Sequence, residues 1–187
     1  FINLRSIKGV AIILVIIFNS LITMMGFMGW IYHFTELDEF YFTMMNTSMP
    51  IVLLTIANSD GVHIISKFFK FLRIEKNKER AIRKTMDNLS FPIFLTSITT
   101  SLAFLTLYFS PVSAMVGYGI TLAFGIMWAW LISNTLLPAI IILLDWNLES
   151  KAISEPSYIE NMMKKLGEII YKKPKTILMI GLSIVLI

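Results

Sequence analysis

One acidic side chain, Asp60, lies inside an apolar segment that is long enough to cross a membrane. Holding a carboxylate in lipid costs on the order of a few kcal/mol, so this group should either take up a proton or find a partner or water. His63 follows one helical turn later and therefore shares a helix face with the acid. Because imidazole titrates near neutrality, the two side chains predict a proton relay or a switchable ion pair.

Hydroxyl side chains are placed to support this pair. Ser59 borders the acid, and a later apolar segment repeats hydroxyls at four-residue spacing, in the pairs Thr96 and Thr100 and Ser97 and Ser101. If the two helices pack side by side, this stripe can donate hydrogen bonds across to the acid. The alternative, favoured for each Ser and Thr taken singly, is a bond back to its own helix or simple packing. For the acid itself, a functional role is the default expectation.

The residue types do not support a metal site, a nucleophilic active site or a nucleotide-binding loop. The chain has no Cys, which excludes a disulfide framework, a thiolate metal site and a cysteine nucleophile. Its two His are too few for a catalytic zinc site, which normally takes three protein ligands. There is no glycine-rich phosphate loop and no nucleophile elbow. We therefore predict that the chain is not an enzyme and that it holds no metal and no cofactor.

The composition places these side chains in a membrane protein. Of 187 residues, 56% are hydrophobic and 15% are charged, and the mean hydropathy is +0.75. A membrane-spanning helix needs about 20 apolar residues. Such runs cover about 9–32, 47–66, 91–109 and 118–144. The third is expected to be entered through Pro92, because proline is tolerated in a first helical turn. We predict an all-α fold, a polytopic membrane helix bundle.

The basic residues test this division independently. Of the 16 Lys and Arg residues, two precede the first span, eight follow the second and six follow the fourth. The loop 33–41 carries acids and no basic residue, and the loop 110–117 carries no charge. All basic residues therefore fall on one side, which the positive-inside rule assigns to the cytoplasm. We predict a multi-pass inner-membrane protein whose Lys- and Arg-rich loops are cytoplasmic, attracted to anionic lipid headgroups and not to nucleic acid.

We expect three parts along the chain. Residues 1–145 form the transmembrane bundle, residues 146–175 a cytoplasmic linker with an amphipathic surface helix, and residues 176–187 the start of a further transmembrane helix. The linker is assigned because apolar residues recur in it at three- and four-residue spacing, with charged residues between them. The first residue is Phe1 and the last apolar run stops abruptly, which indicates a fragment of a longer polypeptide.

The order of these motifs resembles that of the RND superfamily. The residues that carry the likeness are NSDGVH at 58–63, a basic connector, FPIFLTSITTS at 91–101 and LLPA at 136–139. The likeness is strongest to the MMPL/Patched-like exporter branch, whose membrane module is also called a sterol-sensing domain. On this mapping the four spans resemble helices three to six of the first repeat, and the last run resembles the start of helix seven. Asp60 matches the family's proton-relay acid, whereas Gly61 stands where many lipid exporters of the family have Tyr.

The resemblance implies a transporter driven by the proton-motive force that exports hydrophobic or lipid-like molecules. In it, Asp60 relays the proton. From the spacing described above, we add His63 to the relay and expect Ser59, Thr96, Ser97 and Thr100 to support it. The implied partners are the bilayer, protons, the lipid-like substrate, and either further copies of the chain or a periplasmic adaptor. Two alternatives stay open: a sterol- or lipid-sensing module without transport, in which Asp60→Asn leaves function largely intact, and a secretion auxiliary resembling SecD/SecF.

Overall fold

The computed structural model describes residues 6–146 without interruption. Beyond them it describes only residues 153, 162, 163, 167, 168, 170–172, 174, 178 and 179. Most of the surface helix predicted within 146–175 and of the membrane segment predicted at 176–187 therefore lies outside the described residues.

Four long helices make up the described chain: α1 (Ile7–Thr35), α2 (Met49–Glu75), α3 (Lys78–Leu105) and α4 (Ser113–Leu143). Three short 3₁₀ helices join them, η1 (Asp38–Phe40), η2 (Met44–Ser48) and η3 (Thr106–Phe109), and the described residues hold no strand. Each of the four apolar segments falls on one long helix, the second together with η2 and the third together with η3. All four are long and apolar enough to cross a membrane. The all-α membrane bundle is confirmed, and the protein is a multi-pass membrane protein.

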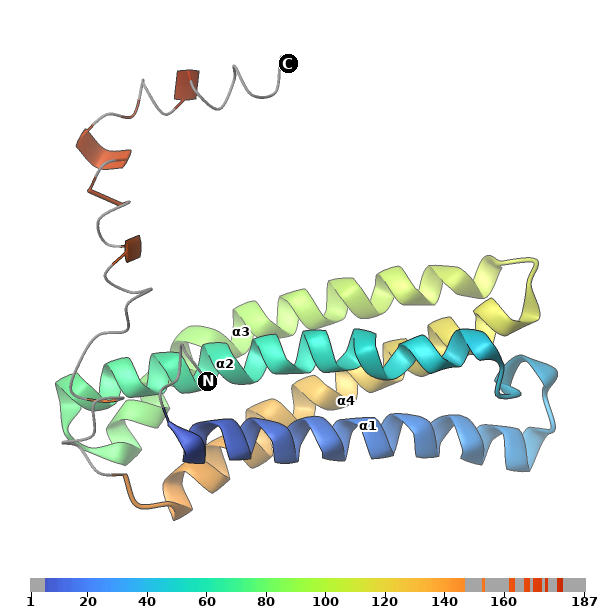
Figure 1. Cartoon of the computed structure of the whole chain (residues 1–187), viewed down its shortest axis with the longest axis horizontal. Coiled ribbons are helices and arrows are strands. Elements are labelled where there is room, and N and C mark those ends of the chain that lie inside the picture. Colours follow the sequence, from blue (N-terminus) through green and yellow to red (C-terminus); the bar gives the residue numbers. More distant parts are fainter. Residues whose placement is uncertain are drawn as a thin grey trace.

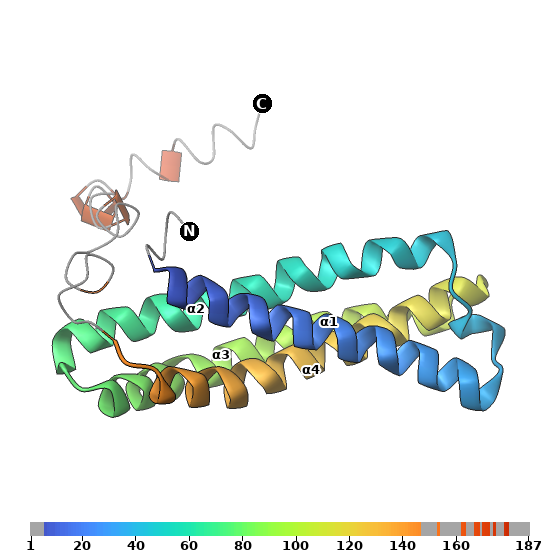
Figure 2. The ribbon, with the colours of Figure 1, turned by 60° about the horizontal axis from the view of Figure 1, so that its bottom comes forward.

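The helices run up and down, so that the start of α1, the turn between α2 and α3, and the end of α4 share one end of the bundle (Figures 1 and 2). We call this the basic end, because Lys8, the Lys and Arg residues of 67–84 and the α4 terminus meet there. The opposite end carries the acids of the α1–α2 connection and, between 33 and 48, no Lys or Arg. The charge sorting expected for a membrane protein thus matches the two ends of the bundle.

The turn between α2 and α3 is short because two local signals meet in it. Lys76 ends α2 with a left-handed backbone (φ 52°). Asn77 then caps α3, its Oδ1 accepting hydrogen bonds from the amides of Glu79 (3.0 Å) and Arg80 (3.1 Å).

The expectation that Pro92 lies in the first turn of its helix is wrong, since α3 starts at Lys78 and continues through the proline. The capping amide outweighs the proline as a start signal, and the cost is one missing amide donor inside the helix.

Glycines let α4 pack closely against its neighbours. A β carbon on Gly117 would lie 1.8 Å from the Glu39 carbonyl oxygen, and one on Gly125 would lie 2.6 Å from Met24 Sδ. Neither distance is compatible with a side chain at the present spacing. These glycines therefore serve close packing.

A side-chain hydrogen bond joins α3 to α4. The Ser101 hydroxyl donates to the Ala123 carbonyl oxygen at 3.1 Å, and Ser101 is buried. We expect Ser101→Ala to lower the free energy of unfolding by about 0.6 kcal/mol, a typical value for such bonds in membranes. Thr99→Ala is the matched control, because the exposed Thr99 hydroxyl bonds only within its own helix. Denaturant unfolding in detergent micelles measures both, and equal losses would contradict the role assigned to Ser101.

Candidate functional site

A cavity of about 480 Å³ between α2 and α3 gathers the candidate side chains proposed from the sequence. Helix α2 contributes Ser59, Asp60 and His63, and α3 contributes Thr96, Ser97 and Thr100. The remaining lining residues are Thr55, Ile56, Leu89, Pro92 and Ile93. The side-by-side packing of the two helices, on which the predicted site depended, is therefore present.

Asp60 faces this cavity from a buried position. Its exposed fraction is 8%, and it is the one charged residue among the buried residues of the described chain. Within residues 6–146, no hydrogen bond or ion pair to its carboxylate is formed. A buried carboxylate without a protein partner must rely on water in the cavity or take up a proton. The geometry thus presents the acid to a space that water and protons can enter.

His63 lines the same cavity one turn closer to the basic end. Its side chain is exposed, as is that of Ser59. In the part of the chain that the structure covers, the imidazole and the Asp60 carboxylate share the cavity without a direct bond. A proton passing between them therefore needs a bridging water or a change of side-chain rotamer.

The threonine hydroxyls of α3 donate to their own helix. Thr96 donates to the Ile93 carbonyl oxygen at 2.8 Å, and Thr100 donates to the Thr96 carbonyl oxygen at 2.7 Å. These two residues follow the back-bonding alternative, and no bond from them to Asp60 is formed in the described structure. Their hydroxyl oxygens still border the cavity, where they can accept hydrogen bonds from water. Ser97 is buried, with an exposed fraction of 2%.

Sequence reasoning missed part of the lining. Thr55 borders the cavity, and its hydroxyl donates to the Ile51 carbonyl oxygen at 2.8 Å. The signal was available, because Thr55, Ser59 and His63 recur at four-residue spacing and so share one helix face. The apolar members of the lining carry no such signal, since they resemble every other residue in these segments.

Gly61, next to the acid, faces a different helix. A β carbon there would lie 3.0 Å from Ile13 Cγ1 of α1, and Gly61 does not line the cavity. The position at which the resemblance led us to expect Tyr is therefore used here for close contact between α1 and α2. No group of three or more His, Asp or Glu side chains that could hold a metal ion occurs among the described residues.

Two comparisons relate the chain to known proteins. The sequence model of the MMPL family matches residues 1–177. Protein dispatched homolog 1 of Mus musculus is 28% identical over 105 residues, which are 55% of this chain and 7% of that protein. The matched region therefore spans less than a tenth of this curated relative. No solved structure matches the chain.

Proposed function

The chain belongs to the MMPL family, and from this membership and the cavity around Asp60 we propose that it forms part of an exporter driven by the proton-motive force. The proposed cargo is hydrophobic or lipid-like, and it leaves the membrane without being chemically altered. The observation that carries the proposal is the placement of a single buried acid in a cavity shared with a histidine, instead of against lipid.

In the proposed cycle a proton arriving from the outer side binds a carboxylate oxygen of Asp60. The neutral acid no longer needs water around it, so α2 and α3 can close on the cavity. Loss of the proton restores the charge and the need for water, and the helices separate again. One proton crossing about 150 mV supplies roughly 3.5 kcal/mol, which is enough to bias a two-state element strongly.

We further propose that the basic end faces the cytoplasm of an inner membrane, following the positive-inside rule. On this orientation His63 lies on the cytoplasmic side of Asp60, because α2 runs toward the basic end. Its exposed imidazole can then accept the proton that Asp60 releases and pass it to water.

Replacing His63 tests this assignment. We expect His63→Gln to slow transport by roughly 10-fold without abolishing it, below the loss typical of an essential acid or base, because water in the cavity can partly replace the imidazole. His33→Gln is the matched control, since His33 lies in the last turn of α1 at the opposite end. Transport in proteoliposomes measures both variants. Complete loss with His63→Gln, or equal slowing with His33→Gln, would contradict the proposed exit route.

A lipid-sensing function is the second candidate, and the size of the cavity favours it. About 480 Å³ lies within the range of small-molecule sites, and Ile56, Leu89 and Ile93 offer apolar contacts to a lipid. In this alternative the cavity binds a ligand and regulates a partner, and proton exchange at Asp60 is not needed.

Proton flux separates the two functions. The purified full-length protein is reconstituted into liposomes that contain a trapped pH-sensitive dye, and a pH gradient is imposed across the membrane. The exporter predicts that protons equilibrate faster than in liposomes without protein. Equilibration at the protein-free rate, with insertion verified, would count against the exporter and favour the sensor.

A further inference from the structure

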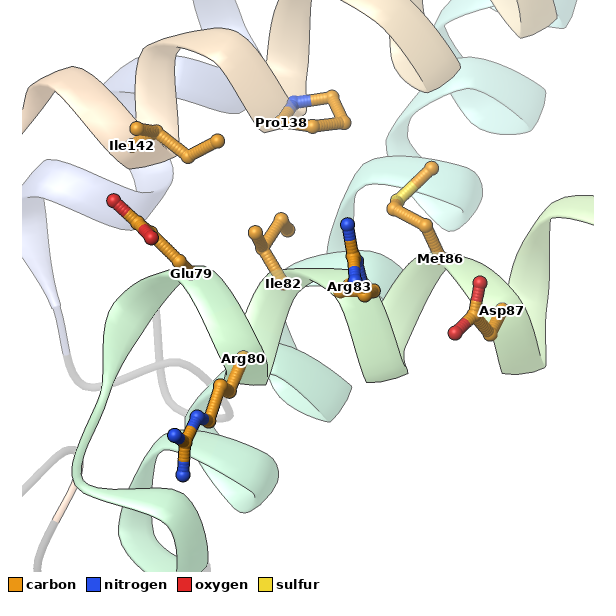
Figure 3. Close-up of a pocket in the computed structure, with 8 residues that line it drawn as sticks. All are labelled: Glu79, Arg80, Ile82, Arg83, Met86, Asp87, Pro138 and Ile142. Carbon is orange, nitrogen blue, oxygen red and sulfur yellow. The ribbon is translucent and has the colours of Figure 1, made fainter.

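A second cavity, of about 550 Å³, lies between α3 and α4 near the basic end (Figure 3). Four charged side chains of α3 line it: Glu79, Arg80, Arg83 and Asp87. Apolar side chains from both helices complete the lining: Ile82, Met86, Pro138 and Ile142. It contains none of the residues of the cavity around Asp60, so an inference about it is independent of the proposed function.

The charged side chains differ in direction. Glu79 and Arg83 project from α3 toward the α4 segment of Pro138 and Ile142, whereas Arg80 points away from α4 (Figure 3). Neighbouring charges are paired, Lys78 with Asp145 at 3.8 Å and Lys84 with Glu75. Within the described chain, neither Glu79 nor Arg83 has an ion-pair partner. One guanidinium and one carboxylate are therefore available to a ligand in this cavity.

The cavity lies where the apolar surface of the bundle ends. Helix α4 carries no charged residue over its length Ser113–Leu143, and Asp145 is the second residue after its end. The cavity faces the last turns of this helix, where Leu143 is 82% exposed and Ile142 is 37% exposed. Because a hydrocarbon core ends where charged residues begin, these turns mark the boundary with the headgroups. A ligand here would meet charged groups on one side and acyl chains on the other.

The charges that line the cavity favour one class of headgroup. The lining has as many carboxylates as guanidinium groups, so an anionic headgroup would be attracted by Arg83 but repelled by Glu79 and Asp87. A headgroup that joins a phosphodiester to a primary ammonium satisfies both signs. Guanidinium binds phosphate through two parallel hydrogen bonds, and a carboxylate accepts hydrogen bonds from an ammonium group.

We propose that this cavity is a binding site for a zwitterionic phospholipid with a primary ammonium headgroup. Arg83 holds the phosphate, and Glu79 or Asp87 holds the ammonium. The glycerol and the first part of the acyl chains lie against Ile82, Met86 and Ile142. The lipid fills the space between α3 and α4 at the basic end and so stabilises the pairing of these two helices.

Native mass spectrometry of the purified full-length protein tests the site, with phosphatidylethanolamine, phosphatidylglycerol and phosphatidylcholine of identical chains as probes. We expect phosphatidylethanolamine to bind most tightly, and Arg83→Gln to weaken that binding roughly 10-fold. Glu79→Gln combined with Asp87→Asn should remove the preference over phosphatidylcholine, whose ammonium has no hydrogen to donate. Arg80→Gln is the matched control and should change the affinity by less than about 2-fold, because Arg80, which is exposed like Arg83, points away from α4.

Three results would overturn the proposal. Tighter binding of phosphatidylglycerol would mean that net positive charge, and not a paired site, attracts lipid. Equal weakening by Arg80→Gln and Arg83→Gln would mean that the basic surface acts as a whole. Displacement of the lipid by equimolar soluble phosphoethanolamine would mean that the site takes a free phosphate compound.

Size-exclusion chromatography verifies that the variants are folded. Arg83→Lys gives a second test, because lysine keeps the positive charge but cannot form two parallel hydrogen bonds to the phosphate. This variant should bind phosphatidylethanolamine with intermediate affinity.

Discussion

Asp60→Asn is expected to abolish proton-coupled transport while leaving the protein folded and inserted. Asparagine has nearly the shape of aspartate, but its amide cannot bind and release a proton at cellular pH. Without that exchange α2 and α3 have no reason to alternate between two arrangements, so the gradient cannot drive them. Proton flux into proteoliposomes should fall to the rate of liposomes without protein, and export by cells that carry the variant should cease.

Stability separates this loss from misfolding. The Asp60 carboxylate is buried and makes no hydrogen bond or ion pair within the described residues, so a neutral amide removes a desolvation cost without breaking a contact. The melting temperature of Asp60→Asn should therefore equal or exceed that of the wild type. Asp38→Asn, at the opposite end in η1, is the matched control and should transport normally. Retained coupled transport in Asp60→Asn would remove the relay.

The acid and its cavity partners could be predicted because helix geometry makes them neighbours. Asp60 and His63 are one turn apart, and Thr96 and Thr100 are four residues apart, so each pair shares a face whatever the tertiary structure. We predicted that these faces meet only if α2 and α3 pack side by side. In the structure the two helices do so, and both faces line one cavity. The acceptors of the Thr96 and Thr100 hydroxyl groups followed from a general preference, since Thr hydroxyls in helices commonly donate to carbonyl oxygens of their own backbone.

Other features depend on contacts that no local pattern encodes. The start of α3 was misplaced because the prediction rested on Pro92, whereas Asn77 caps the helix in the finished turn. The second cavity joins Arg83 to Pro138, which are far apart in the chain, and nothing in either segment alone predicts the space between them. The contact between Gly117 and Glu39 is of the same kind, since it depends on how the α1–α2 connection crosses α4.

We expect Gly117→Ala to destabilise the protein. The added β carbon would lie 1.8 Å from the Glu39 carbonyl oxygen and 2.6 Å from its carbonyl carbon. Both are backbone atoms, so no side-chain rotation relieves the overlap, and η1 must move away from α4. Such overpacking costs roughly 3 kcal/mol, and the better helix propensity of alanine returns about 1 kcal/mol. We expect a net loss of about 2 kcal/mol, which lowers the melting temperature by roughly 5 °C.

Gly26→Ala tests whether this loss comes from the contact or from the residue type. Gly26 lies in the middle of α1, and a β carbon there would meet no atom within 4 Å. Alanine should therefore leave the melting temperature unchanged or raise it, because only the helix propensity changes. If Gly117→Ala melts like Gly26→Ala in the same detergent, the α1–α2 connection does not pack on α4 at this distance, and the close approach assigned to Gly117 is wrong.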